Sequence, residues 1–347
     1  MSKKLFTFVA IIMIAAMLLS ACATTPTAAP TALPKPTDAD CAKAEVLCVG
    51  VVTDVGEIDD KSFNQSAWEG VKLAESELGA VVNYIETKDA KDYASNIALF
   101  GDKKYDVIVT IGFAMGQATI EAAAVYPEIK FIGVDQGQWD GTVANVAGLI
   151  FDEWKSGFLA GALAAQLTKT NVIAGVYGTD LVPPVVNFKE GYEAGAKYVK
   201  ADITVISTFH PGGMDVAFTD PEWGAATAKQ AIGQKADVVF GAGGKTGNGA
   251  LIETAGNAGL FCIGVDSDQW ETVPEAHACL VSSAMKLITP GVLDLIKLAK
   301  DGKFPGGNYI GAVGLAGFHD FDSKVDAAIK AKLAEIDKAL VDGTIVR

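Results

Sequence analysis

The chain has 347 residues, is 50% hydrophobic and carries a formal net charge of −14. That length suits two domains of ordinary size, each with its own core. A chain this acidic repels phosphate backbones, so nucleic acid is excluded as an expected partner.

The first residues have the features of a secretory signal. Two lysines precede an apolar run from Leu5 to Leu19, which is too short to span a membrane. The stretch Leu19-Ser20-Ala21-Cys22 resembles the bacterial lipobox, in which the cysteine is acylated and becomes the first residue. We predict a signal peptide over residues 1–21, a lipid on Cys22 and a position on the extracytoplasmic face of the cell membrane. The alternative is a plain signal peptide in which Cys22 has no special role.

The segment that follows is too polar and too small in its side chains to build a core. Ala23 to Asp40 contains four prolines, many threonines and no aromatic residue. Proline keeps such a segment extended and semi-rigid. We predict that residues 22–44 form a stalk between the lipid and the folded part.

Four cysteines remain if Cys22 carries the lipid: Cys41, Cys48, Cys262 and Cys279. An even number in an oxidising compartment favours disulfides. Three pairings are possible, and proximity in the sequence favours Cys41–Cys48 with Cys262–Cys279. No Cys-x-x-Cys motif and no spaced group of histidines indicates a metal, so we expect neither a metal nor another cofactor.

Short apolar runs alternate with helical patterns along the rest of the chain. This order is typical of parallel sheets covered by helices on both faces and wound by right-handed crossovers. The expected strands are Leu47–Thr53, Val81–Ile85, Val107–Ile111 and Lys130–Val134, then Val172–Tyr177, Ile203–Ser207, Val238–Phe240 and Phe261–Val265. Helical periodicity covers Ala67–Leu78, Gly116–Ala124, Trp154–Leu167, Ala225–Ile232 and Asp326–Val341.

An internal repeat indicates that the two halves share one design. FIGVDQGQW, from Phe131 to Trp139, matches CIGVDSDQW, from Cys262 to Trp270, and the strand before each copy begins at the same distance from it. We therefore predict an α/β fold of two doubly wound, Rossmann-like lobes. Lobe one takes residues 45–152 and 282–308, with a helix over 282–300, and lobe two takes 153–281 and 309–347. Three crossings between them would make a hinge.

In open α/β sheets, ligands bind at the carboxyl ends of the strands. That rule selects Asp54, Ser62, Phe63 and Asn64 after the first strand, Phe113 after the third and Asp135 after the fourth; in lobe two it selects Gly243 and Asp266. Carboxylates facing a cleft suit a neutral ligand rich in hydrogen-bond donors.

Some of these residues have a plain structural alternative. Asp54 and Asp60 could cap the helix that follows them, as could Ser62 or Asn64. The glycine-rich stretch Gly241–Gly249 matches neither the P-loop nor the dinucleotide pattern, which leaves a close backbone approach at a helix start.

These motifs resemble the basic membrane lipoprotein family, whose members are substrate-binding proteins of ABC transporters and bind purine nucleosides. The resemblance rests on VGVVTDVGEIDDKSFNQSAWEG (49–70), TIGFAMGQAT (110–119), FIGVDQ (131–136), PPVVNFKEGYEAG (183–195), GVDSDQW (264–270) and SSAMKL (282–287). It implies a type I periplasmic-binding-protein fold and a monomer that delivers a nucleoside such as inosine, adenosine or guanosine to a permease.

The resemblance also implies a role for each matching residue. Phe63 and Phe188 would stack on the two faces of the base. Asp54, Asn64 and Asp135 would contact the base or its surroundings, and Asp266, Gly243 and Lys286 would hold the ribose hydroxyls.

Two other functions stay open at this point. A sugar- or signal-binding receptor can use the same scaffold, because a fold does not determine its ligand. A nucleoside-hydrolysing enzyme would need an acidic cluster, for which Asp54, Asp59 and Asp60 are the candidates.

Overall fold

The computed structural model describes residues 36–347. The predicted signal peptide, Cys22 and most of the predicted stalk lie outside this range. Within it, no helix is both long enough and apolar enough to cross a membrane.

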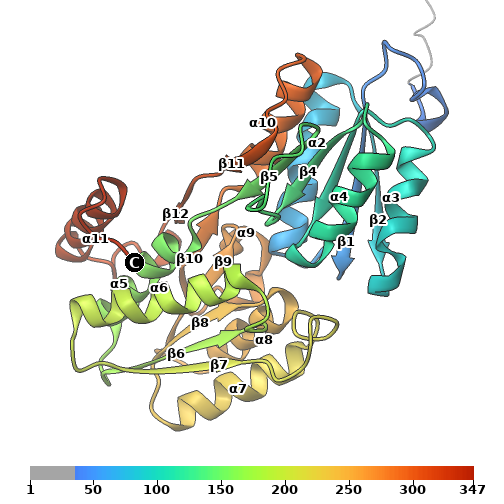
Figure 1. Ribbon diagram of the computed structural model, residues 1–347. Coiled ribbons are helices and arrows are strands. Elements are labelled where there is room, and N and C mark those ends of the chain that lie inside the picture. The colour runs from blue at the N-terminus through green and yellow to red at the C-terminus, as the bar shows by residue number, and fades with distance from the viewer. Residues whose placement is uncertain (1–35) are drawn as a thin grey trace, which may run out of the picture. The chain divides into compact units, whose positions relative to one another are not determined.

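The first lobe is built on a six-stranded parallel sheet with the order β11-β5-β4-β3-β1-β2. Its strands are β1 (Cys48–Val55), β2 (Val81–Thr87), β3 (Val107–Ile111), β4 (Lys130–Val134), β5 (Val146–Ile150) and β11 (Gly307–Ile310). The helices around it are α2 (Phe63–Leu78), α3 (Tyr93–Gly101), α4 (Gly116–Val125) and α10 (Ile288–Lys300), as Figure 1 shows. Strand β3 is fully buried, and β4 is buried except at Lys130, because helices cover both faces.

The second lobe repeats this plan in the order β12-β10-β9-β8-β6-β7, with only β12 antiparallel to its neighbour among the described strands. Its strands are β6 (Val172–Tyr177), β7 (Thr204–Phe209), β8 (Val238–Ala242), β9 (Phe261–Asp266), β10 (Leu280–Lys286) and β12 (Val313–Leu315). Its helices are α5 (Glu153–Leu167), α6 (Pro183–Val199), α7 (Pro221–Gly233), α8 (Gly244–Ala255), α9 (Gln269–Thr272) and α11 (Ala327–Val341).

The repeat occupies the same place in both sheets. Strands β4 and β9, which begin the two copies, are each third in their sheet's order. Asp135 directly follows β4 and Asp266 ends β9, and both have left-handed backbones, at φ 62° and 65°. A non-glycine residue adopts this conformation rarely, so the same strained turn presents a carboxylate from each lobe. The predicted fold class, two lobes of one design, is confirmed.

The chain crosses between the sheets three times, after β5, after β10 and after β11. The helix predicted over 282–300 is wrong in its first part. Residues 282–286 belong to β10 of the second sheet, and the helix α10 begins only at Ile288. Residues 309 and 310, which were predicted in lobe two, pair with β5 in the first sheet. Ser282, Ser283 and Lys286 interrupt the apolar run of β10, which hid the strand.

Helices α5 and α6 pack closely because glycines line their contact. A Cβ added to Gly157 would lie 2.5 Å from the carbonyl oxygen of Phe188, and one added to Gly195 would lie 1.9 Å from that of Phe158. Only glycine permits this backbone approach. The packing fixes where Phe188 and the first turn of α5 lie, and both reach the boundary between the lobes.

Each lobe carries one disulfide: Cys41–Cys48 in the first and Cys262–Cys279 in the second. The first ties the start of β1 to the segment that precedes it. The second links β9 to the loop before β10. This is the pairing that proximity in the sequence favours.

Candidate ligand-binding cleft

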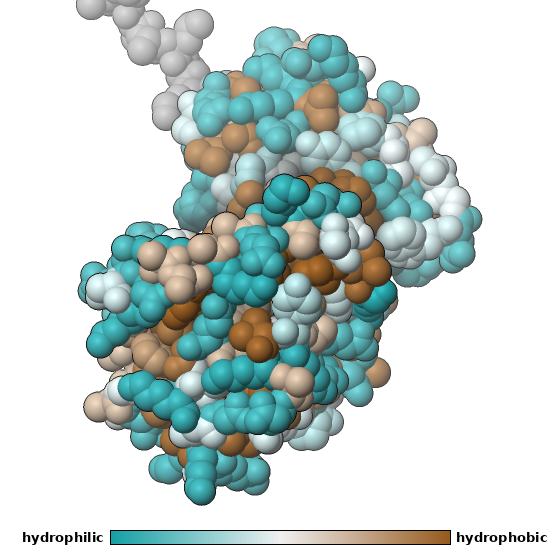
Figure 2. Space-filling model, turned by 90° about the vertical axis from the view of Figure 1, so that its left-hand side faces the viewer, coloured by the Kyte–Doolittle hydropathy of each residue, from teal (hydrophilic) through white to brown (hydrophobic). Residues whose placement is uncertain are grey.

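A cleft of about 890 Å³, including its open mouth, lies between the two lobes. On the face that Figure 2 shows, apolar side chains gather where the lobes meet, while much of the outer surface is polar. The walls include the predicted residues Asp54, Phe63, Asn64, Phe113, Asp135, Phe188, Gly243, Asp266 and Lys286. Both lobes therefore contribute to one cavity at the carboxyl ends of their strands.

Asp54 enters the cleft from the end of β1, beside Gly112 at the end of β3. A Cβ at Gly112 would lie 2.1 Å from Oδ2 of Asp54, and Gly112 has φ +107°. Glycine thus makes the space that the carboxylate occupies. Phe113, which follows, is 42% exposed and lies at the mouth of the cleft.

The polar residues of the loop before α2 have different roles. Asp60 accepts hydrogen bonds from the backbone N–H groups of Ser62, Asn64 and Gln65, at 2.9, 3.0 and 3.1 Å. It therefore caps the first turn of α2, as the structural alternative held. Asn64 donates through Nδ2 to the carbonyl of Glu57, while its Oδ1 is buried without a partner among the described residues.

Ser62 lies behind the cleft wall instead of lining it. Its Oγ donates to Oδ2 of Asp266 at 2.8 Å, so it joins the loop of lobe one to the end of β9 in lobe two. This bond orients Asp266 and leaves Oδ1 of that carboxylate directed toward Lys286, at 3.8 Å from Nζ.

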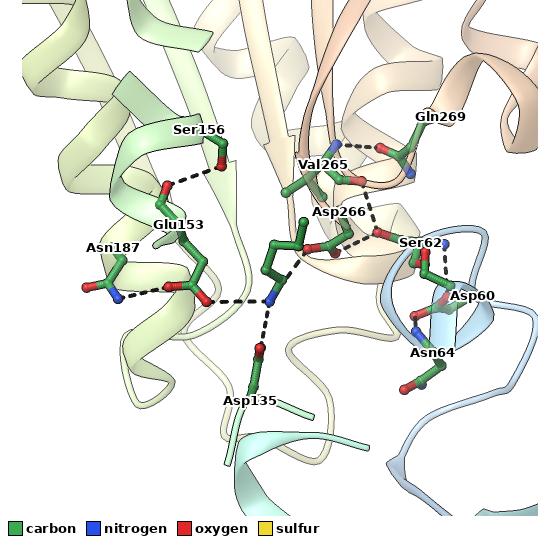
Figure 3. Close-up of polar contacts among 12 residues, drawn as sticks. Asp60, Ser62, Asn64, Asp135, Glu153, Ser156, Asn187, Val265, Asp266 and Gln269 are labelled. Carbon is green, nitrogen blue, oxygen red and sulfur yellow. Dashed lines mark hydrogen bonds and ion pairs between the residues drawn. The ribbon is translucent and has the colours of Figure 1, made fainter. Parts of the chain in front are cut away.

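Lys286 is the centre of a buried ionic cluster, whose acids Asp135, Glu153 and Asp266 are labelled in Figure 3. It ends β10 and is 3% exposed. Its Nζ donates to Oδ2 of Asp135 at 2.6 Å, and it lies 3.8 Å from both Glu153 and Asp266. Oδ1 of Asp135 is buried and unpaired within the described residues. The hydrogen bonds of such a buried charged cluster are strong. A ligand hydroxyl that enters the cleft can accept from the ammonium group of Lys286 and donate to a carboxylate beside it.

Three aromatic rings surround the ammonium group of this lysine. Nζ of Lys286 lies 4.5 Å from the ring centre of Phe63, 5.5 Å from that of Phe151 and 5.8 Å from that of Phe188. Phe63 begins α2 in lobe one, and Phe188 lies in α6 of lobe two. Of these rings, Phe63 and Phe188 line the cleft, and with the lysine they form a surface on which a flat, polar-edged ligand can lie.

Burial shifts the protonation of these groups. Desolvation, with help from Asp60 and Asp135, raises the pKa of Asp54 to about 8. Desolvation also raises the pKa of Asp60 to about 6, although three backbone amides act against it. At pH 7 Asp54 is therefore mostly protonated and can donate a hydrogen bond as well as accept one.

In the ionic cluster, burial and the attraction between opposite charges shift the pKa values in opposite directions. Burial alone would lower the pKa of Lys286, but Asp135, Asp266 and Glu153 outweigh it and raise that pKa above its ordinary value. Burial raises the pKa of Glu153 to about 7, with Lys286 acting against it. The pKa values of Asp135 and Asp266 are also raised by burial and held down in part by Lys286. The lysine stays charged while its acids compete for one positive partner.

Further bonds close the lobes against each other. Asn248 and Gln269 of lobe two donate to the carbonyls of Asp60 and Lys61, at 2.9 and 3.2 Å, and Thr272 donates to Lys61 at 2.7 Å. At the mouth, Lys245 forms an ion pair with Glu57. Gly243 and Gly244 lie at the start of α8, and a Cβ added to Gly243 would lie 2.6 Å from the backbone nitrogen of Gly178, so the backbones approach closely there.

Some residues of the site were missed by the sequence analysis, namely Glu57, Tyr93, Glu153, Asn187 and Lys245. Glu153 directly precedes the predicted helix over 154–167, and Asn187 lies in α6, a helix that was not predicted. A signal existed for Glu153: it stands at the start of a helix that is otherwise almost entirely apolar and buried.

Two like-folded lobes, a hinge of three crossings and an interlobe cleft define a two-lobed solute-binding protein. A family model described as ABC transporter substrate-binding protein, PnrA-like, matches residues 48–346. The chain belongs to this family, the Bmp family. Its members are the solute-binding components of ABC transporters, and these components work outside the cytoplasm.

Similar proteins agree with this assignment. The chain is 34% identical to the ABC transporter nucleoside-binding protein BmpA of Lactococcus lactis, over 84% of this chain and 87% of that protein. It is 30% identical to basic membrane protein A of Borreliella burgdorferi, over 87% and 88%. Among solved structures it resembles a solute-binding protein of Aeropyrum pernix, with a TM-score of 0.75 and 25% identity over 86% of this chain and 92% of that one.

Proposed function

We propose that this protein captures purine nucleosides in the interlobe cleft and delivers them, as a monomer, to an ABC permease. The observation that carries the proposal is the surface made by Phe63, Phe188 and Lys286 beside the carboxylates of Asp135 and Asp266. Aromatic rings stack on any base at about 1–3 kcal/mol per base. Carboxylate oxygens accept hydrogen bonds from neighbouring hydroxyls of a ribose.

The relatives support the same ligand class, since the Lactococcus lactis protein is named for nucleoside binding. A sugar-binding receptor would use the carboxylates but leave the aromatic residues of both lobes without a base to contact. A hydrolase based on Asp54, Asp59 and Asp60 lacks support, because Asp59 is exposed and Asp60 is occupied by backbone amides. We infer that the ligand leaves chemically unchanged.

Calorimetry with ligand-stripped protein tests this function. Inosine, adenosine or guanosine should bind measurably, while free ribose should bind at least about tenfold more weakly because it offers no ring to stack on. Inosine 5′-monophosphate should also bind more weakly, because the carboxylates of Glu57, Asp60, Asp135 and Asp266 in the cleft wall outnumber the cations Lys245 and Lys286. Tight binding of a sugar with no response to any nucleoside would contradict the proposal, as would release of free base from a bound nucleoside.

We further propose that the protein is held at the membrane by a lipid on Cys22. The motif Leu19-Ser20-Ala21-Cys22 and the proline-rich segment after it support this anchor. Cells expressing the full chain should incorporate labelled palmitate into it, and a Cys22→Ala variant should not. Equal labelling of both proteins would show that the lipid, if present, is elsewhere.

A further inference from the structure

The ionic cluster of Lys286 is divided unequally between the lobes. Lys286 ends β10, Asp266 ends β9 and Glu153 begins α5, and all three elements belong to lobe two. Asp135 follows β4 of lobe one. Of the three acids around the lysine, only Asp135 therefore lies across the cleft.

Glu153 contacts the lysine from behind the cleft. It is 2% exposed and does not line the cavity, so it is out of reach of a ligand. Its Oε1 lies 3.8 Å from Nζ of Lys286, and its Oε2 accepts from Nδ2 of Asn187 at 3.1 Å. Figure 3 shows Asn187 beside Glu153, on the side away from Asp266. Asn187 holds one oxygen so that the other stays directed at the ammonium group.

The bonds that close the cleft near the lysine must break when the lobes separate. Lys286 then loses its 2.6 Å bond to Asp135, and Asp266 loses its 2.8 Å bond from Ser62. A buried ammonium without a partner is strongly disfavoured. Glu153 and Asp266 move with Lys286, so they remain as its partners.

We propose that Glu153 is a positioning residue that keeps Lys286 paired and in place on lobe two while the cleft is open. In the closed form, Glu153 in its ionised state also adds a third negative charge around a single ammonium group, which repels Asp135. Both effects favour opening. Glu153 therefore sets the balance between open and closed forms without touching the ligand.

The inference concerns the ligand-free protein, so it does not depend on which solute the cleft binds. Small-angle X-ray scattering of ligand-stripped full-length chains measures the balance through the radius of gyration. In Glu153→Gln the open lysine keeps only Asp266, so the open-to-closed ratio should fall roughly tenfold and the radius of gyration should decrease. In Asp135→Asn the closed form loses its ion pair, and the radius should increase.

Asp237→Asn is the matched control. Asp237 is a buried carboxylate of lobe two that accepts from Thr168, Lys169 and Thr170, away from the lobe boundary. Its loss should lower stability without changing the radius of gyration of the folded protein. Asn187→Ala, which frees Glu153 to turn, should reproduce the effect of Glu153→Gln in weaker form and replaces it if that variant does not fold.

The result that overturns the proposal is equally specific. An unchanged or larger radius of gyration in both Glu153→Gln and Asn187→Ala would show that Glu153 does not favour opening. The same decrease in Asp237→Asn would show that any lost buried charge has this effect. If nucleosides fail to bind but the two variants of the cluster shift in opposite directions, the proposed ligand is wrong and the role of Glu153 stands.

Discussion

Replacing Lys286 by methionine should lower the free energy of unfolding by roughly 3–5 kcal/mol near pH 8, as removal of one partner from a buried ionic group does. The methionine fills a similar volume but leaves Asp135, Glu153 and Asp266 without their positive partner. Three buried carboxylates cannot all stay ionised at that separation, so each must bind a proton or destabilise the fold.

The loss should depend on pH in a defined direction. Burial already raises the pKa of Glu153 to about 7, and removal of Lys286 raises it further. A carboxyl group whose pKa rises on folding binds protons in the native state that the unfolded chain has released above about pH 4. Stability therefore falls as the pH rises from about 4 through 7, and the variant should recover much of its loss at pH 5.

Urea unfolding at pH 5 and pH 8 measures both effects. Lys330→Met is the control, because Lys330 forms an exposed 2.6 Å ion pair with Asp322 on the surface of lobe two. Exposed pairs contribute about 0–1 kcal/mol, so this variant should stay close to the wild type at both values. A loss for Lys286→Met that is equal at pH 5 and pH 8 would contradict the view that uncompensated carboxylates cause it.

Removing one ribose hydroxyl from the ligand should weaken binding roughly 5- to 150-fold if Asp266 accepts from it. Oδ2 of Asp266 is occupied by Ser62, whereas Oδ1 has only the ion pair with Lys286 at 3.8 Å and keeps acceptor capacity. An acceptor left unpaired in a closed cleft loses about 1–3 kcal/mol, and 1.4 kcal/mol is a factor of ten. Ribonucleosides should therefore bind more tightly than 2′-deoxynucleosides.

Two variants separate the sugar contact from the stacking contact. Asp266→Ala should lose affinity for ribonucleosides and reduce their advantage over deoxynucleosides. Phe63→Ala should weaken both ligands by a similar factor, because stacking does not depend on the sugar. Calorimetry on these pairs decides the matter. If Asp266→Ala keeps the full preference for ribose, the carboxylate has another role, even if the protein still binds nucleosides.

The sequence predicted the central strands β1, β3, β4, β6, β8 and β9, which are apolar and buried on both faces, but it missed β5, which is also buried. The bounds of β3, β4 and β6 agree with the apolar runs that predicted them. Strands β11 and β12 lie at sheet edges, are short and carry few buried side chains, so they have no such run. In β10, Ser282 and Ser283 are buried but satisfied by bonds with Ala316 and Gln269, which hydropathy does not reveal.

The site could be predicted in part from the same rule. The carboxyl ends of the strands supplied most of the cleft lining, because the polar residues there follow directly after apolar runs. The role of Asp60 could not be chosen from the sequence, because a carboxylate in such a loop can either face a ligand or bind the amides of the next helix. In the structure it binds the amides. The apolar helix that follows Glu153 marks this residue as unusual, but neither its partner nor Asn187 could be placed, because both depend on how closely α5 and α6 pack.

The three crossings between the lobes have a consequence for the order in which the protein folds. The last strand of the first sheet, β11, and the last strand of the second, β12, are supplied by neighbouring segments near the end of the chain. Helix α10, which packs on α2, is also made late. Neither lobe can complete its sheet during synthesis until residues 307–315 have emerged. Both halves therefore reach their final form together, although the residues of the first half are made long before.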